Sequence, residues 1–156
     1  MKDFINEYKN KGLIKEENID INQVLKHLER AKKDLRAANA NFKIDIEISY
    51  DCAYKAMLRS GRALMFSFKY RPIDGEQHKT VVAFSEHVLG PEYSKIVKHF
   101  DRMRKKRNRF TYDEPELLVS ETETRQALEN AKTFFEEVCK FIQNKNLLYY
   151  GPELNQ

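Results

Sequence analysis

A chain of 156 residues is long enough for one domain with a single core and too short for two. With 41% hydrophobic and 33% charged residues it is not a disordered chain, and its apolar runs fall short of the roughly 18 residues that span a bilayer. The N-terminus has no apolar export signal, and Cys52 and Cys139 lie among apolar neighbours. We therefore predict a cytoplasmic protein without membrane contact, whose two cysteines are core thiols rather than a disulfide.

Apolar residues recur every three to four positions along most of the chain, which indicates helices. A short helical segment opens the chain and ends at Gly12, and a loop containing Pro72 and Gly75 breaks the pattern further on. The main predicted helices cover about 20–39, 45–68, 77–89, 91 to the residues before Pro115, and 120 to about 142.

Two of these helices begin with capping signals. Asp20 is followed by Gln23, and Ser120 by Glu123, which is the spacing of a capping box. In such a box each side chain binds the backbone N–H of the other residue. Within the helix at 45–68, four small residues leave room for another helix to approach closely: Ala53, Ala56, Ser60 and Gly61.

Short connections between long helices favour antiparallel neighbours. We predict an all-α fold, an up-and-down bundle of four main helices with the short 77–89 helix packed alongside. The bundle occupies residues 20–145. It follows an N-terminal extension or short helix at 1–19 and precedes a C-terminal tail at 146–156.

The stretch from Arg102 to Arg109 holds six positive charges, whereas the whole chain has a net charge of +4. A local positive patch on a nearly neutral body favours a polyanion such as nucleic acid, although a solvated face at a helix end is the alternative. Helical steps from Phe100 and Met103 both lead to Arg107, so this arginine points the way the core residues point. Because an unpaired desolvated guanidinium is costly, we expect Arg107 to reach water, pair with a carboxylate, or face a second subunit or an anion.

The segment RKKRNRFTYDEP, from Arg104 to Pro115, resembles the motif of the HEPN superfamily (higher eukaryotes and prokaryotes nucleotide-binding). That motif is an Arg, often followed by a polar residue, and then a His four to six positions after the Arg. Arg107 and Asn108 match its first half, and Tyr112 stands where the His belongs. The segments SYDCAYKAMLRSGRALMFSFKYRP and GEQHKTVVAF are also similar to this superfamily.

The resemblance implies a small helical bundle and, in many members, metal-independent RNA cleavage by toxins or defence effectors at a site where two protomers meet. In that chemistry the Arg would stabilise the charged phosphorane, the Asn would bind a phosphate oxygen and the His would move a proton. Tyr112 is a poor base at pH 7, since the reference pKa of tyrosine is about 10. We therefore predict a homodimer that binds RNA or a nucleotide and cleaves RNA weakly or not at all.

The motif positions are Arg107, Asn108 and Tyr112, and the predicted nucleic-acid-binding residues are Arg104, Lys105, Lys106, Arg107 and Arg109. Two alternatives stay open. One is an active metal-independent ribonuclease toxin in which Tyr112 or a displaced histidine serves, His99 being eight residues upstream on roughly the same side of the helix. The other is a non-catalytic subunit that partners a nucleotidyltransferase or acts within a toxin–antitoxin pair, with Arg107 sealing a dimer interface.

The histidines do not indicate a metal site. His78, His87 and His99 stand nine and twelve residues apart, and His27 is remote, so none has the spacing of a metal ligand pair. His78, where a loop turns into a helix, reads as a local cap or a packing residue. We predict no metal and no cofactor.

Overall fold

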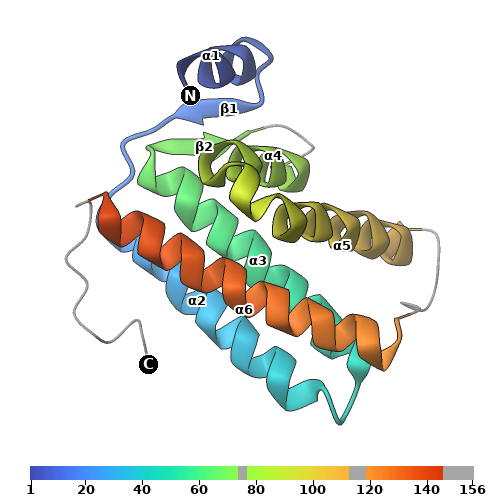
Figure 1. Cartoon of the computed structure of the whole chain (residues 1–156). Coiled ribbons are helices and arrows are strands. Elements are labelled where there is room, and N and C mark those ends of the chain that lie inside the picture. The colour runs from blue at the N-terminus through green and yellow to red at the C-terminus, as the bar shows by residue number, and fades with distance from the viewer. Residues whose placement is uncertain (74–76, 113–118, 146–156) are drawn as a thin grey trace.

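The computed structural model describes residues 1–73, 77–112 and 119–145, with the backbone alone at 110–112. This part of the chain forms six helices, one 3-10 turn and two short strands (Figure 1). In chain order the elements are α1 (Lys2–Asn10), β1 (Ile14–Glu16), α2 (Ile21–Asn41), α3 (Ile46–Ser67), β2 (Tyr70–Pro72), α4 (Gln77–Leu89), η1 (Pro91–Tyr93), α5 (Ser94–Tyr112) and α6 (Glu121–Asn144). The predicted all-α bundle is confirmed.

Helix α3 is the centre of the fold. It packs against both α2 and α6, and α4 and α5 cover a further side of it (Figure 1). A helix that is buried around most of its circumference belongs to a core. The largest fully buried side chains come from several of these helices and include Tyr54, Met57, Leu64, Phe84, Phe100 and Phe134.

The start of α2 is fixed by the predicted capping box. Asp20 Oδ1 accepts a hydrogen bond from Gln23 N at 3.0 Å, and Gln23 Oε1 accepts one from Asp20 N at 2.9 Å. At the start of α6, Ser120 Oγ accepts from Glu123 N at 3.0 Å. Only this half of the predicted capping box is present, because the Glu123 carboxylate binds Lys106 of α5 at 2.7 Å instead and ties the first turn of α6 to α5.

Helices α3 and α4 approach each other closely at Gly61. A Cβ atom at this position would lie only 2.5 Å from Val81 Cγ1 and 3.1 Å from Ser85 Oγ. The close contact confirms the prediction that the small residues of α3 admit another helix. It also brings the first turn of α4, which carries His78, against α3.

The two strands were not predicted, because three residues each are too few to show an alternating pattern. They pair antiparallel, with Ile14 opposite Pro72. This pair attaches the N-terminal segment to the bundle, and Phe4 of α1 stacks on His87 of α4 with ring centroids 4.3 Å apart. The tail predicted at 146–156 lies outside the described residues.

Both cysteines are free thiols, as predicted. Burial raises the pKa of Cys139 to about 12, so this thiol is unreactive at neutral pH. In the described ranges no helix combines the length and the apolar character that crossing a membrane requires.

Candidate functional site

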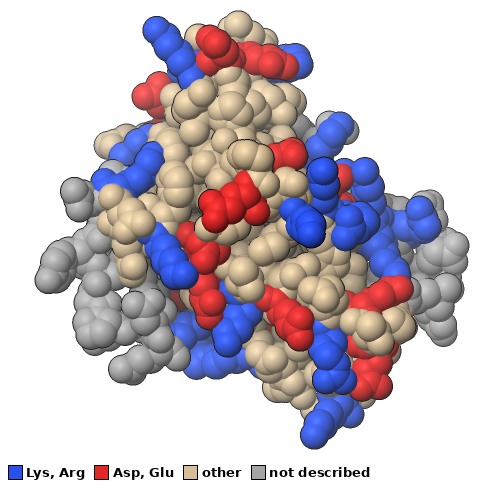
Figure 2. All heavy atoms as spheres, in the orientation of Figure 1, with Lys and Arg blue, Asp and Glu red and all other residues tan. Residues whose placement is uncertain are grey.

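The predicted site residues belong to the C-terminal half of α5. Val97, Phe100 and Met103 bury one face of this helix in the core, which leaves its charged residues along the flanks and the outer face. Lys and Arg side chains gather over α5 on the surface of the molecule (Figure 2). The flanks differ, because one meets α3 and α4 and the other meets α6.

Arg107 is held on the flank that meets α3. Its Nε donates to Asp51 Oδ1 at 3.0 Å, and its Cζ lies 5.4 Å from the centre of the Tyr54 ring. About a quarter of the side chain, 27%, remains exposed. Of the arrangements expected for Arg107, the structure therefore contains the pair with a carboxylate, and that carboxylate belongs to the same chain.

Two further contacts extend this arrangement. Asp51 Oδ2 also accepts Lys55 Nζ at 2.7 Å, so the carboxylate bridges two cations. The hydroxyl of Tyr54 lies 2.8 Å from Nδ1 of His78 on α4. The chain Arg107–Tyr54–His78 thus joins three helices on one side of α5.

Burial shifts the pKa values of His78 and Tyr54 in opposite directions. Burial lowers the pKa of His78, and Arg62, Arg107 and Arg104 lower it further. Burial raises the pKa of Tyr54 to about 12. His78 is therefore neutral at neutral pH and able to accept a proton or a hydrogen bond.

Sequence reasoning missed Asp51, Tyr54 and His78 as members of this site. Asp51 and Tyr54 are three residues apart and so share a helix face, which is a signal that the sequence contained. His78 has no such signal, since its place beside Tyr54 depends on how α4 packs on α3.

The neighbouring cations of α5 are in part neutralised within the chain. Arg104 and Lys105 both pair with Asp101, at 2.8 and 3.0 Å, and Lys106 pairs with Glu123. Arg109 is exposed and forms no ion pair within the described residues. The acidic residues at 113 and 114, which follow the cluster in the sequence, lie outside the described part of the chain.

The other two motif residues, Asn108 and Tyr112, lie further along α5. Asn108 follows Arg107 on α5 and is partly exposed. Tyr112 is the last residue of α5, and its side chain lies outside the described atoms. Weak or absent RNA cleavage, the consequence expected from Tyr at the position of the motif His, therefore stays a prediction from the sequence.

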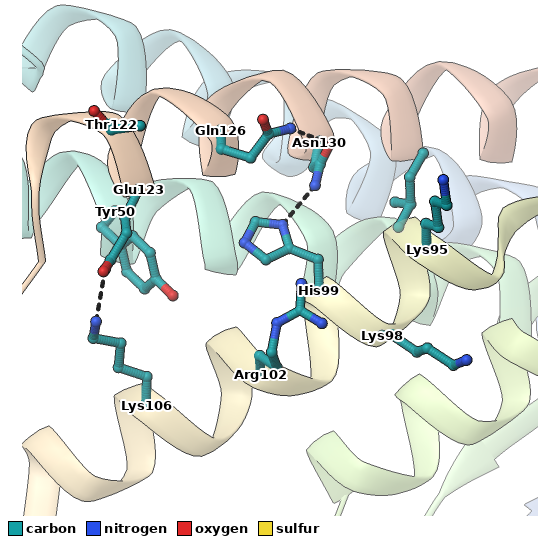
Figure 3. Close-up of a pocket in the computed structure, with 11 residues that line it drawn as sticks. Tyr50, Lys95, Lys98, His99, Arg102, Lys106, Thr122, Glu123, Gln126 and Asn130 are labelled. Carbon is teal, nitrogen blue, oxygen red and sulfur yellow. Dashed lines mark hydrogen bonds and ion pairs between the residues drawn. The ribbon is translucent and has the colours of Figure 1, made fainter.

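The flank of α5 that meets α6 forms an open groove of about 880 Å³ (Figure 3). Lys95, Lys98 and Arg102 of α5 line it, and within the described residues none of the three forms an ion pair. Gln126 and Asn130 of α6 line the opposite wall. The groove therefore offers cations on one side and amide groups on the other, where Glu123 also lies with its charge balanced by Lys106. This arrangement suits a phosphate-bearing chain.

His99 lies in this groove, and the prediction that it shares the Arg107 side of the helix is wrong. Its Nδ1 is 2.6 Å from Asn130 Nδ2 of α6 (Figure 3). The step of eight residues from His99 to Arg107 turns an α-helix by two full turns and about 80° more, so His99 contacts α6 whereas Arg107 contacts α3. Burial lowers the pKa of His99, with Arg102 lowering it further, so this histidine is also neutral at pH 7.

The described side chains contain no group of three or more His, Cys, Asp or Glu residues that could hold a metal ion. In comparisons with known proteins, the model of a family described as the HEPN domain matches residues 24–144. This range includes α5 and every side chain of the site described above. No curated protein matches the chain.

Proposed function

Because the chain belongs to the HEPN domain family, we propose that it binds RNA or a nucleotide along α5, with Arg107 and Asn108 at the centre of the site. Arg104, Lys105, Lys106 and Arg109 surround that centre on the same helix. The observation that carries this proposal is the fixed position of Arg107, which Asp51 and Tyr54 hold while a quarter of its side chain stays exposed.

A guanidinium whose orientation is set by a carboxylate and an aromatic ring is preorganised to bind phosphate. Less side-chain entropy is then lost on binding, and the planar donors match phosphate oxygens. The groove beside α6 extends the site, since Lys95, Lys98 and Arg102 can contact further phosphates. A bound strand would thus cross the outer face of α5 from one flank to the other.

The experiment that tests this function is a titration of single-stranded RNA at low salt. Low salt matters because phosphate contacts weaken steeply with ionic strength. We expect Arg107→Ala to weaken binding about tenfold or more, as for the loss of a strong charged contact of about 1.5–3 kcal/mol. The matched control Arg36→Ala removes the same charge from an exposed position of α2. Equal affinity of wild type and Arg107→Ala would refute the site.

We propose weak cleavage or none, because Tyr112 takes the position of the motif His. General acid–base catalysis contributes about 10²–10⁴ in rate. A tyrosine with a pKa near the reference value of about 10 does not supply a base at neutral pH.

Metal-independent ribonuclease activity is the second candidate, and the contact between Tyr54 and His78 favours it. In that reaction the ribose 2′-oxygen attacks phosphorus, the bond to the 5′-oxygen breaks, and the 2′-hydroxyl proton passes to a base while the leaving oxygen gains a proton. His78 is neutral, lies on the Arg107 side, and in one tautomer presents Nε2 as the acceptor. Cleavage of labelled RNA in the presence of chelator, abolished by His78→Gln and retained in His99→Gln, would establish it. No cleavage by wild type over hours would reject it.

We further propose that the chain is a homodimer. A partner such as a nucleotidyltransferase or an antitoxin remains a prediction from the sequence. The in-chain pair of Arg107 with Asp51 argues against Arg107 as the residue that seals a dimer interface. Light scattering of wild type and Arg107→Ala tests this directly. A dimer that dissociates on this substitution, in a protein that never binds RNA, would favour the interaction subunit instead.

A further inference from the structure

A second basic pocket lies away from α5, where α2, α3, β2 and the start of α4 meet. Its volume is about 360 Å³. Cations from three elements line it: Lys26 of α2, Arg62 of α3 and Arg71 of β2. Gln23 and Gln77 contribute amide groups. In the described part of the chain, no carboxylate is among the lining residues.

Arg62 is the unusual member of this pocket. It is partly buried, and its Nε is shielded from solvent without a hydrogen-bond partner in the described residues. The guanidinium donates through Nη2 to the neutral Gln77 Oε1 at 3.1 Å and pairs with no described carboxylate. Burial lowers the pKa of Arg62, and Arg59 is the next largest cause. Such a desolvated cation is costly unless an anion accompanies it.

Among the described residues, no carboxylate compensates the charge of Arg62. The Arg59 guanidinium is paired with Asp34 at 2.9 Å, and Arg71 lies 2.7 Å from Glu17, although the latter pair is not aligned as a hydrogen bond. These pairs use the available carboxylates for other cations. The pocket therefore keeps a positive charge.

The pKa of His27 reflects the same positively charged surroundings. Its ring packs edge-on against Phe66, with centroids 4.7 Å apart, in the wall of the pocket. Burial lowers the pKa of His27 to about 4, and Arg62, Arg59 and Arg71 contribute to the shift. A neutral histidine beside these arginines marks a place that disfavours another proton and favours an anion.

We propose that this pocket binds the phosphate group of a phosphomonoester. Guanidinium groups present a planar fork of donors that matches phosphate oxygens, and a lysine adds a mobile cation. The volume is at the lower end of small-molecule sites, which run from about 300 to 1,000 Å³. The phosphate belongs either to a free nucleotide or to the 5′ end of an RNA, which present the same chemical group.

The test is a titration of inorganic phosphate and of adenosine 5′-monophosphate, followed through the NMR signals of the His27 ring. A bound dianion favours the charged ring, so we expect phosphate to raise the pKa of His27. Arg62→Gln should weaken phosphate binding at least tenfold. Arg36→Gln, which removes a charge from an exposed position of α2, should leave it unchanged, and the His27 signals report this pocket rather than the α5 site. Circular dichroism checks that Arg62→Gln is folded.

Lys26→Gln, at an exposed position, serves as the second variant and should weaken binding severalfold. Two RNA strands, one with a 5′-phosphate and one with a 5′-hydroxyl, show whether the bound phosphate belongs to an RNA end or to a free nucleotide. Tighter binding of the phosphorylated strand that is lost in Arg62→Gln supports the RNA end. Binding of the mononucleotide with no difference between the strands supports a free nucleotide. No phosphate binding in the millimolar range, or equal binding by wild type and both pocket variants, overturns the proposal.

Discussion

The two flanks of α5 carry cations from one short stretch of sequence, yet they form different environments. On the flank facing α3 and α4, Arg107 is paired with Asp51 and packed on Tyr54. On the flank facing α6, Lys95 and Arg102 line an open groove, and neither forms an ion pair with a described residue. The difference teaches that the role of a basic cluster is set by the carboxylates and rings that its neighbours supply, and not by its charge count. One flank fixes a single guanidinium, and the other presents Lys95 and Arg102 without a described carboxylate partner.

The largest effect on RNA affinity should come from neutralising the cations of the groove between α5 and α6. The variant with Lys95→Gln, Lys98→Gln and Arg102→Gln is expected to bind RNA about ten- to a hundredfold more weakly at low salt. Each lost phosphate contact also lowers the slope of log affinity against log salt by about one. Fluorescence anisotropy over a salt series measures both quantities.

The matched control for that variant changes three exposed cations away from α5. They are Lys33, Arg36 and Lys43, each replaced by Gln. An equal loss in this control would mean that only net charge matters, and the distinction between the flanks of α5 would then fail.

Gly61→Ala should disturb only the flank of α5 that faces α3 and α4. The added methyl group would meet Val81 and force α4 away from α3, which we expect to lower the free energy of unfolding by about 1–3 kcal/mol. Urea denaturation measures this loss. The NMR signals of His78 should move because α4 moves, while those of His99 stay in place. An unchanged stability would show that the two helices do not depend on this close contact.

Stability should fall as the solution becomes acidic, through histidines on both flanks. Burial lowers the pKa of His78 and of His99 from the usual value of 6.5. The unfolded chain then binds protons first, so the free energy of unfolding decreases as the pH falls below about 6.5. His78→Gln and His99→Gln should each make this decrease smaller between pH 7 and pH 5. A decrease of unaltered size in both variants would contradict the assigned shifts.

The smallest expected effects are changes in the pKa of the histidine on each flank when the arginine beside it is removed. Removing Arg107 should raise the pKa of His78 and leave that of His99 unchanged, because Arg107 lowers only the former. Arg102→Gln should do the reverse. NMR titration of the two rings measures both pKa values in each variant. If either substitution shifted the two pKa values equally, the two flanks would not be electrostatically separate.

The sequence predicted those features that depend on local periodicity. The capping pair of Asp20 and Gln23 and the inward direction of Arg107 follow from residues within a few turns of one helix. The site residues Asp51 and His78 could not be assigned in this way. Asp51 meets Arg107, and His78 meets the neighbouring Tyr54, only when three helices pack together. His99 was misplaced for a related reason. A separation of eight residues turns a helix past the flank where Arg107 lies.

A titration of single-stranded RNA into labelled protein, observed through the four histidine rings, tests the central claim most directly. RNA that crosses α5 should shift the signals of His78 and His99, on the two flanks. It should leave His87, stacked on Phe4 of α1, where it was. Signals of His78 and His99 that stay fixed at saturating RNA, or a response confined to His87, would contradict binding along α5.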